Sequence, residues 1–220
     1  MLVSKSPRHR HYSVALLVNA LCFILLLLLT LWLLRGHLPA LKAQPSSIHF
    51  VSAPSPNYRP MRSRHIDTIV LHYTSGINVD PRHWADPRVS LNIFKRYHVS
   101  AHYLVDRAGI IFQLVQEHNV AWHAGGSIMP APDNRHNVNS FSIGIETIAT
   151  AHSGFTDAQY RSLVYLIRGI EQRYPIRHLV GHDEIAGTRA VRMGLRRDLK
   201  EDPGPLFDWG RLRGLLHEGE

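Results

Sequence analysis

The longest apolar stretch of the chain lies near its start. Residues 14–34 form a run of 21 residues without a charge, in which only Asn19 and Thr30 are polar. At about 1.5 Å per residue, a helix of this length covers roughly 30 Å, which is the thickness of the hydrocarbon core of a bilayer. A buried core helix in a domain of this size would not be so uniformly apolar. The run therefore predicts one transmembrane helix at residues 14–34.

The residues that flank this run orient it in the membrane. Lys5, Arg8 and Arg10 precede it and no acidic residue does, which places the N-terminus in the cytoplasm by the positive-inside rule. The alternative is a cleaved signal peptide. The run is longer than a usual h-region of about 7–15 residues, and residues 41–43 match the small-x-small cleavage pattern poorly. Under both hypotheses the rest of the chain is exported. The predicted organisation is a cytoplasmic basic tail, a transmembrane helix, a linker and one exported domain, at residues 1–13, 14–34, 35–48 and 49–220.

Beyond the linker, short apolar runs alternate with helical patterns. The run from Ile66 to Tyr73 is rich in Ile, Val and Thr, which is typical of a buried strand. Thr156 and Gln159 form a capping box, so we expect a helix from residue 157 to 173. Further strands are predicted at 101–105 and 110–115, joined by a hairpin turn at 106–109, and at 142–150 and 178–181; further helices are predicted at 87–97 and 209–216. This order predicts the α/β class, with a central mixed sheet flanked by helices.

Charge and cysteine content restrict the partners and the chemistry of the exported domain. Residues 1–42 hold five of the 25 basic residues and none of the 17 acidic ones, so the remainder has 20 and 17, a net charge of +3. The high overall charge is therefore no sign of nucleic-acid binding. The single cysteine, Cys22, lies in the apolar run. Any metal in the exported domain must consequently be held by nitrogen and oxygen ligands.

Three residues far apart in the sequence are candidates for such ligands. His72 ends a predicted strand, His182 follows a short predicted strand and Gly181, and Asp202 precedes Pro203, which restricts its backbone. Taken singly, each has an ordinary explanation: a hydrogen-bonded core histidine, a histidine in a polar loop, and an Asp-Pro-Gly turn. Taken together, two imidazoles and one carboxylate can hold a zinc ion whose fourth position stays open to water. That arrangement supports hydrolysis.

A carboxylate and an ammonium group are candidates to act beside this metal. On an alternating strand, Glu146 faces away from Ile143 and Ile145. A carboxylate on a mostly apolar strand is either paired or functional, and a general base is what a hydrolytic site needs. Lys200 precedes Asp202 by two residues, so both side chains point the same way in an extended segment. There the ammonium could stabilise an oxyanion. The alternative for Lys200 is an ordinary solvated lysine.

These residues lie in segments that resemble one enzyme family. The chain resembles the zinc-dependent N-acetylmuramoyl-L-alanine amidases, in the superfamily that includes the peptidoglycan recognition proteins. The matching segments are SPNY at 55–58, IVLHYT at 69–74, VSAHY at 99–103, AWHAG at 121–125, NSFSIGIE at 139–146, GHDEIA at 181–186, and KEDPGP at 200–205 with FDW at 207–209. The resemblance covers about residues 49–211. It implies the amidase fold, a central mixed sheet with helices packed on it, and zinc as the cofactor.

The resemblance also implies roles for individual residues. The implied zinc ligands are His72, His182 and Asp202. The implied catalytic pair is Glu146 and Lys200, and the implied substrate-binding residues are Trp122, His123 and His102. The implied reaction is hydrolysis of the amide bond between the lactyl group of N-acetylmuramic acid and the L-alanine of the stem peptide, through a zinc-activated water. The partners would be peptidoglycan or muropeptides, and the membrane through the N-terminal helix.

Two departures from the family pattern bear on substrate preference and loop geometry. Residues 187–199 add a basic stretch between His182 and Asp202 that compact members lack, and this stretch could line the cleft. Glu146 is followed by Thr147 and Ile148, where some relatives carry a second acidic residue and a glycine. The functional alternatives are a non-catalytic peptidoglycan-binding module on a membrane anchor, and a zinc peptidase or other amidohydrolase with a different substrate. No predicted ligand is missing, which favours the amidase.

The membrane run indicates where the enzyme would act. A cytoplasmic enzyme that recycles muropeptides would have no use for residues 14–34. We therefore expect a single-pass protein of the bacterial inner membrane, with its catalytic domain in the periplasm or cell-wall space. The intact polymer, a soluble muropeptide and an anhydro fragment are all open as substrates.

Overall fold

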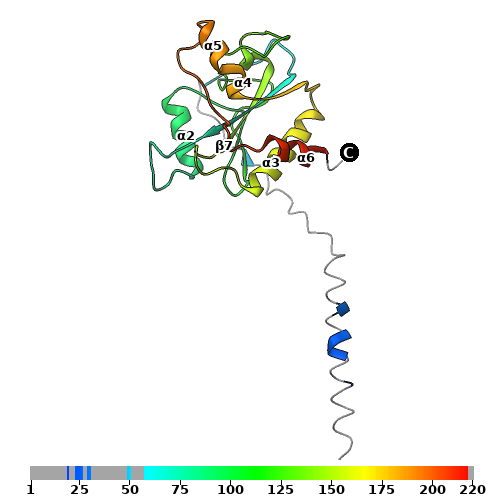
Figure 1. Cartoon of the computed structure of the whole chain (residues 1–220). Coiled ribbons are helices and arrows are strands. Elements are labelled where there is room, and N and C mark those ends of the chain that lie inside the picture. Colours follow the sequence, from blue (N-terminus) through cyan, green and yellow to red (C-terminus); the bar gives the residue numbers. More distant parts are fainter. Residues whose placement is uncertain (1–18, 20–22, 27–28, 31–48, 51–56, 218–220) are drawn as a thin grey trace, which may run out of the picture. The chain divides into compact units, whose positions relative to one another are not determined.

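The computed structural model describes residues 19, 23–26, 29–30, 49–50 and 57–217 (Figure 1). The chain divides into two units, residues 1–44 and 45–220, and the second is described here. The predicted tail and linker, and most of the predicted membrane span at 14–34, lie outside the described residues. Within the described part of the chain, no helix has the length and apolar character needed to span a membrane.

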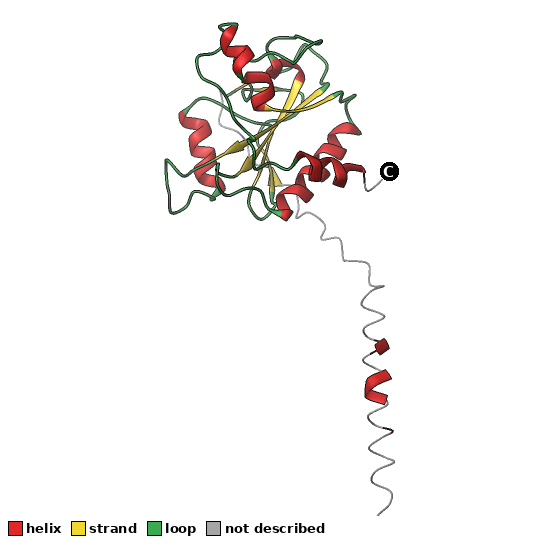
Figure 2. Ribbon diagram, in the orientation of Figure 1, coloured by secondary structure: helices red, strands yellow, loops and turns green. Residues whose placement is uncertain are grey.

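A six-stranded mixed sheet forms the centre of the second unit (Figure 2). Its strands, in spatial order, are β1 (His49–Phe50), β5 (Ile111–Gln113), β4 (Tyr103–Val105), β7 (Ser142–Ile148), β3 (Thr68–Thr74) and β8 (His178–Gly181). Strands β4, β7, β3 and β8 run parallel, and β5 runs antiparallel to β4. A separate antiparallel pair joins β2 (Tyr58–Arg59) to β6 (Val120–Ala121). The predicted α/β class with a central mixed sheet is confirmed.

Helices occur where the sequence predicts them and in three further places. The helices are α2 (Pro87–Arg96), the 3-10 helix η1 (Val138–Phe141), α3 (Asp157–Glu171), α4 (His182–Ala186), α5 (Thr188–Arg192) and α6 (Trp209–His217). The capping box is present, since Thr156 Oγ1 accepts from the Gln159 N–H at 3.1 Å and Gln159 Oε1 accepts from the Thr156 N–H at 3.0 Å. The predictions at 87–97, 157–173 and 209–216 are confirmed. The short elements η1, α4 and α5 were not predicted.

The hairpin between β4 and β5 is also as predicted. Asp106 Oδ1 accepts from the N–H groups of Ala108 at 2.9 Å and Ile110 at 2.8 Å. Gly109 adopts a φ of +84°, a left-handed conformation that favours glycine. The predicted strands at 66–73, 142–150 and 178–181 are confirmed as β3, β7 and β8, with small shifts at their ends.

The two faces of the sheet are covered by different elements. Helices α3 and α6 cover one face, where Leu71 of β3 and Ile145 of β7 belong to the largest buried cluster. Two smaller clusters lie elsewhere, one built around Val70 and Phe141 and the other around Phe94 of α2. Since side chains alternate along a strand, the neighbours of Leu71 and Ile145, which are His72 and Glu146, project from the opposite face. The predicted orientation of Glu146 is confirmed.

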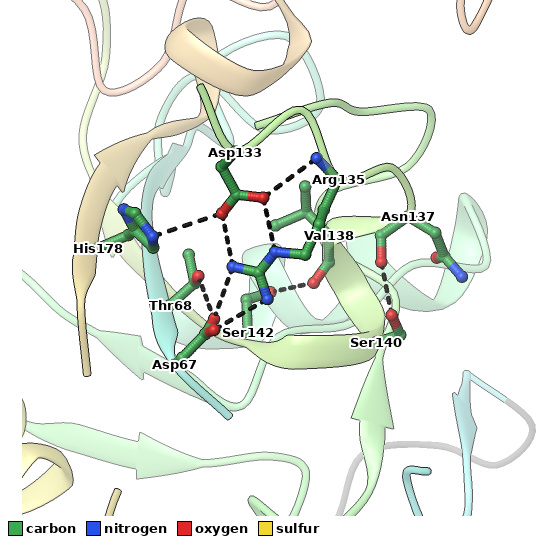
Figure 3. Close-up of polar contacts among 9 residues, drawn as sticks. All are labelled: Asp67, Thr68, Asp133, Arg135, Asn137, Val138, Ser140, Ser142 and His178. Carbon is green, nitrogen blue, oxygen red and sulfur yellow. Dashed lines mark hydrogen bonds and ion pairs between the residues drawn. The ribbon is translucent and has the colours of Figure 1, made fainter. Parts of the chain in front are cut away.

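An ionic cluster ties a loop to the amino ends of the strands (Figure 3). Arg135 donates from Nη1 and Nη2 to Asp67 at 2.8 and 3.1 Å, and from Nε and Nη2 to Asp133 at 2.6 Å each. His178 Nε2 lies 3.4 Å from Asp133 Oδ2. Because Asp67 precedes β3 and His178 begins β8, the cluster fixes the starts of two strands whose carboxyl ends carry predicted metal ligands.

Candidate metal centre

The three predicted metal ligands meet at the carboxyl ends of two neighbouring strands. His72 is on β3, and His182 directly follows β8, which pairs in parallel with β3. Asp202 Oδ2 lies 3.1 Å from Nδ1 of His72 and 3.1 Å from Nδ1 of His182. The three ligand atoms all lie within 4.8 Å of one another. The structure therefore brings together the set that the sequence suggested.

Backbone contacts hold His182 and Asp202 side by side. A Cβ at Gly181 would lie 2.8 Å from Cδ of the Pro203 ring and 2.2 Å from Asp183 Oδ1, so a larger residue at the end of β8 would displace the loop that carries Asp202 or the Asp183 side chain. The Gly181 N–H donates to Glu184 Oε1 at 2.8 Å, which closes the first turn of α4 at His182. The Asp183 N–H donates to the Asp202 carbonyl at 2.9 Å. This last bond fixes the loop of the third ligand against the helix that carries the second.

A chain of hydrogen bonds determines which nitrogen of His72 carries the proton. Ser142 Oγ donates to the carbonyl of Val138 at 2.7 Å (Figure 3), and a carbonyl can only accept. Ser142 Oγ can therefore accept from His123 Nε2 at 3.2 Å, which leaves His123 Nδ1 with its lone pair. That lone pair accepts from His72 Nε2 at 3.0 Å. A neutral imidazole has one N–H, so His72 directs the lone pair of Nδ1 at Asp202.

His182 reaches the same state by a shorter route. Its Nε2 lies 3.3 Å from the carbonyl oxygen of Ala124, which can only accept, so Nε2 carries the proton; in a ring with one N–H, Nδ1 then has the lone pair. Two imidazole lone pairs and a carboxylate oxygen thus meet with no proton between them. Three acceptors so close together repel one another unless a cation lies among them. Their 3.1 Å separations approach the edge of about 3.3 Å expected for a tetrahedral zinc site. The residues fit a zinc ion.

The electrostatics of the ligands agree with this assignment. Burial and the neighbouring His182 lower the pKa of His72 to about 4, so His72 is neutral at pH 7. Burial alone would raise the pKa of Asp202, but the two imidazoles beside it lower that pKa well below its usual range. A neutral nitrogen ligand and an ionised carboxylate are the forms that bind a metal.

Glu146 lies next to His72 on the adjacent strand. The two residues are register partners in the parallel pair β3–β7. Glu146 Oε2 is buried and has no hydrogen-bond partner among the described residues. Burial and then Asp202 raise the pKa of Glu146 well above its usual range, while Lys200 lowers it. An unsatisfied carboxyl with a raised pKa beside a metal site is typical of a general acid or base.

Lys200 lies near these groups but on the surface. Its side chain is exposed, and its charge lowers the pKa of both Glu146 and His72. Its backbone N–H donates to the Ala186 carbonyl at 3.1 Å, which places it just outside the metal ligands. Its part in stabilising an oxyanion stays a prediction.

The three predicted substrate-binding residues have different surroundings. Trp122 is 36% exposed and presents its side chain to solvent. His123 is buried behind His72, and His102 is fully buried, with Nδ1 accepting from the Gly144 N–H at 3.0 Å. The contacts of His123 and His102 favour supporting roles inside the protein. Contact with a substrate stays a prediction for Trp122.

Several supporting residues were not predicted from the sequence. Asn139 Oδ1 accepts from the N–H groups of His123 at 3.1 Å and Ala124 at 2.7 Å, and Ser142 links His123 to the Val138 carbonyl. A Cβ at Gly144 would lie 2.3 Å from Cγ of His123, so the imidazole lies directly on the backbone of β7. Gly144 was the one sequence feature that could have indicated this contact, since a glycine inside a strand of β-branched residues indicates close approach of another group.

Comparisons with known proteins agree with the site. Residues 62–205, which include all five predicted ligand and catalytic residues, match the family N-acetylmuramoyl-L-alanine amidase. The 1,6-anhydro-N-acetylmuramyl-L-alanine amidase AmpD of Citrobacter freundii is 42% identical over 120 residues, which is 54% of this chain and 57% of that protein. The chain thus spans little more than half the length of this relative. AmpD of Haemophilus influenzae is 35% identical over 182 residues, which is 76% of this chain and 88% of that protein.

A solved structure extends the likeness to the fold. The amidase AmiD from Escherichia coli, in complex with the substrate anhydro-N-acetylmuramic acid-L-Ala-D-γ-Glu-L-Lys, superposes with a TM-score of 0.54 at 31% identity. The match covers 71% of this chain and 60% of that chain. The family match spans well over half of the sequence and confirms the resemblance seen in the motifs. The chain therefore belongs to the N-acetylmuramoyl-L-alanine amidase family.

Proposed function

We propose that the chain is a zinc-dependent amidase that hydrolyses the bond between the lactyl group of N-acetylmuramic acid and the L-alanine of a peptidoglycan stem peptide. One observation carries the proposal: Nδ1 of His72, Nδ1 of His182 and Oδ2 of Asp202 converge as acceptors beside Glu146, whose Oε2 is buried. The names of the relatives support the choice of bond. A zinc ion held by these three residues would polarise the amide carbonyl and lower the pKa of a water in its open position.

The protein residues would prepare this site before the substrate arrives. His72 and His182 offer the lone pairs of their Nδ1 atoms, and Asp202 offers one negative charge. The bond from His72 to His123, and the bond from His182 to the Ala124 carbonyl, hold both rings in the ligating tautomer. Such outer partners orient metal-binding histidines and raise their basicity.

Glu146 would move the proton during the reaction. As water forms the new C–O bond at the lactyl carbonyl, Glu146 Oε2 takes the water proton. When the C–N bond breaks, the nitrogen of L-alanine takes that proton and leaves as an amine. One water is consumed, and the products are the lactyl carboxylate and a free peptide. The ammonium of Lys200 would offset the negative charge that develops on the carbonyl oxygen.

The test is incubation of the full chain with purified muropeptides, followed by mass spectrometry of the products. We expect peptides free of muramic acid, loss of this activity with a chelator, and recovery with zinc. Activity that resists the chelator, or none after zinc is restored, would refute the proposal. Glu146→Ala should bind muropeptides and leave them intact, which separates an enzyme from a binding module because a binding module would not depend on this residue.

We further propose that the domain acts outside the cytoplasm from a membrane anchor. The uncharged run at 14–34 and the basic residues before it support this placement. The described residues of that run include Phe23 to Leu26, which are helical and expose their side chains. The test is a pair of reporters fused after Glu220, one active only outside and one only inside the cytoplasm. Activity of the cytoplasmic reporter alone would exclude this placement.

A further inference from the structure

The basic stretch at 187–199 is folded against the metal centre. The N–H of Lys200 donates to the Ala186 carbonyl at 3.1 Å, so the residues that flank the two ends of the stretch lie side by side. Helix α5 lies within it, and Arg189 of that helix donates to the Met129 carbonyl at 3.0 Å. The Leu195 N–H donates to the Ala190 carbonyl at 3.0 Å. These contacts give the stretch a defined path across the loop that follows His123.

Gly126 is where the backbone of this stretch packs most closely on the loop that follows His123. A Cβ at Gly126 would lie 2.0 Å from the Leu195 carbonyl oxygen and 3.5 Å from Cβ of Arg196. Gly126 lies two residues after Ala124, whose carbonyl accepts from the metal-ligand candidate His182. Arg196 is therefore placed at the edge of the site by close backbone packing.

The guanidinium of Arg196 has an unsatisfied donor. Its Nε donates to the Asp198 carbonyl at 2.5 Å. Its Nη1 is buried and has no hydrogen-bond partner in the part of the chain that the structure describes. Burial lowers the pKa of Arg196, and the nearby carboxylates of Asp202 and Asp198 raise it, so the group lies within electrostatic range of a metal ligand. The neighbouring Arg192 and Arg197 are exposed. A buried N–H without an acceptor is unfavourable and is satisfied when an acceptor on a ligand reaches it.

We propose that Arg196 binds the free α-carboxylate of a γ-linked glutamate in the stem peptide, an inference that rests on the proposed function. Because this glutamate is linked through its γ-carboxyl group, its α-carboxylate is free and ionised, and the glutamate follows the L-alanine whose amide bond is cut. In an extended peptide the carboxylate lies on the order of 7 Å from the cut bond, about two residue lengths. The guanidinium of Arg196 lies beside the metal ligands and is not one of them, which suits that distance. Guanidinium N–H groups bind carboxylates strongly and with defined geometry.

The experiment compares two peptides that differ in one group. They are N-acetylmuramoyl-L-Ala-γ-D-Glu-L-Lys and the same compound with an α-carboxamide in place of the α-carboxylate. Dissociation constants are measured by calorimetry on the zinc-loaded full chain in a Glu146→Gln background, so that turnover does not interfere. Arg196→Gln is the test variant. Arg197→Gln is the matched control, because it removes the same charge from the exposed adjacent position.

We expect the carboxylate peptide to bind about 10- to 100-fold more tightly than the carboxamide when Arg196 is present. Arg196→Gln should reduce this ratio to about 1, with the zinc content unchanged by mass spectrometry, whereas Arg197→Gln should keep it. The inference is refuted if the Glu146→Gln chain with Arg196 intact binds the two peptides equally or binds neither detectably. It is also refuted if Arg196→Gln weakens the binding of both peptides by the same factor. A lower zinc content in Arg196→Gln would instead show that Arg196 acts on Asp202. If the wild-type chain binds but cleaves neither peptide, the proposed function fails, while the binding ratio still decides the role of Arg196.

Discussion

Replacing Ser142 with alanine tests the hydrogen-bond chain behind His72 without changing a ligand. The Ser142 side chain is fully buried, and its hydroxyl joins His123 Nε2 to the Val138 carbonyl. Alanine fits the same space, so the change removes the hydroxyl and little packing. His123 Nε2 then loses its acceptor, and the ring is free to move its proton to Nδ1. In that tautomer it faces the Nε2–H of His72 at 3.0 Å, donor against donor.

The expected loss follows from this geometry. In Ser142→Ala, the His123 tautomer with its proton on Nδ1 competes with the tautomer that has its proton on Nε2. Only the second tautomer accepts from His72 Nε2, so zinc binding must shift His123 back to it. Loss of one neutral hydrogen bond is worth about 0.5–1.5 kcal/mol. Loss of an outer partner of a metal-binding histidine lowers metal affinity about 10- to 100-fold. We therefore expect the zinc dissociation constant of Ser142→Ala to rise about 10-fold, the low end of that range. His123→Ala removes the acceptor of His72 itself and should approach the high end.

The assay is competition for zinc between the full chain and a chromophoric chelator of known affinity. Ser140→Ala is the matched control. Ser140 is 3% exposed and its hydroxyl also donates to a carbonyl, that of Asn137 at 2.8 Å (Figure 3), but among the described residues it forms no hydrogen bond with a histidine. Circular dichroism establishes that both variants are folded. Equal zinc affinities for the two alanine variants would refute the assignment of the His72 tautomer.

Three further predictions concern packing, acid stability and the metal. Gly144→Ala should lower both the melting temperature and the zinc affinity, because the new Cβ would lie 2.3 Å from the His123 ring. The control is Gly169→Ala, where a Cβ meets only the flexible end of Arg173 at 3.3 Å, and it should be neutral or stabilising. An equal loss of stability in both variants would refute this explanation. The hydrogen bond from Arg135 lowers the pKa of Asp133, so its contribution to stability is present above its unfolded value of about 3.9 and is lost as pH falls through the lower folded value. In urea titrations the gap between wild type and Asp133→Asn should be largest near pH 7 and shrink toward pH 3, and a gap that grows on acidification would contradict the sign. At a free zinc concentration of 100 times the dissociation constant, removal of zinc should lower the free energy of unfolding by about 2.7 kcal/mol. Calorimetry should then show a fall of about 5–10 °C in the melting temperature. A melting temperature that does not depend on the metal would show that no metal binds the folded state.

The ligands could be predicted from the sequence because each has a local signal. His72 ends an apolar run, His182 follows a short strand and a glycine, and Asp202 precedes a proline. The residues behind them have no such signal. His123 and Ser142 are far from His72 in the sequence, and they meet it only because β3 and β7 pair in parallel and the segment around His123 folds onto the strand.

The basic stretch shows the same limit on a smaller scale. Helices α4 and α5 have five residues each, which is too short for a helical period to be recognised. The sequence therefore showed an excess of arginine at 187–199 but not which arginine is partly buried beside the site. That choice depends on Leu195 packing against Gly126, a contact between segments far apart in the chain.

Support for both histidine ligands comes from one short segment. His123 Nδ1 accepts a hydrogen bond from His72, and the carbonyl of the next residue, Ala124, accepts one from His182. Both N–H groups of this pair are bound by Asn139 Oδ1, so a single side chain on η1 fixes the two supports at once. The residue before them, Trp122, is exposed. A substrate group that contacts Trp122 therefore touches the segment that orders both ligands, which makes substrate binding and metal geometry properties of the same few residues.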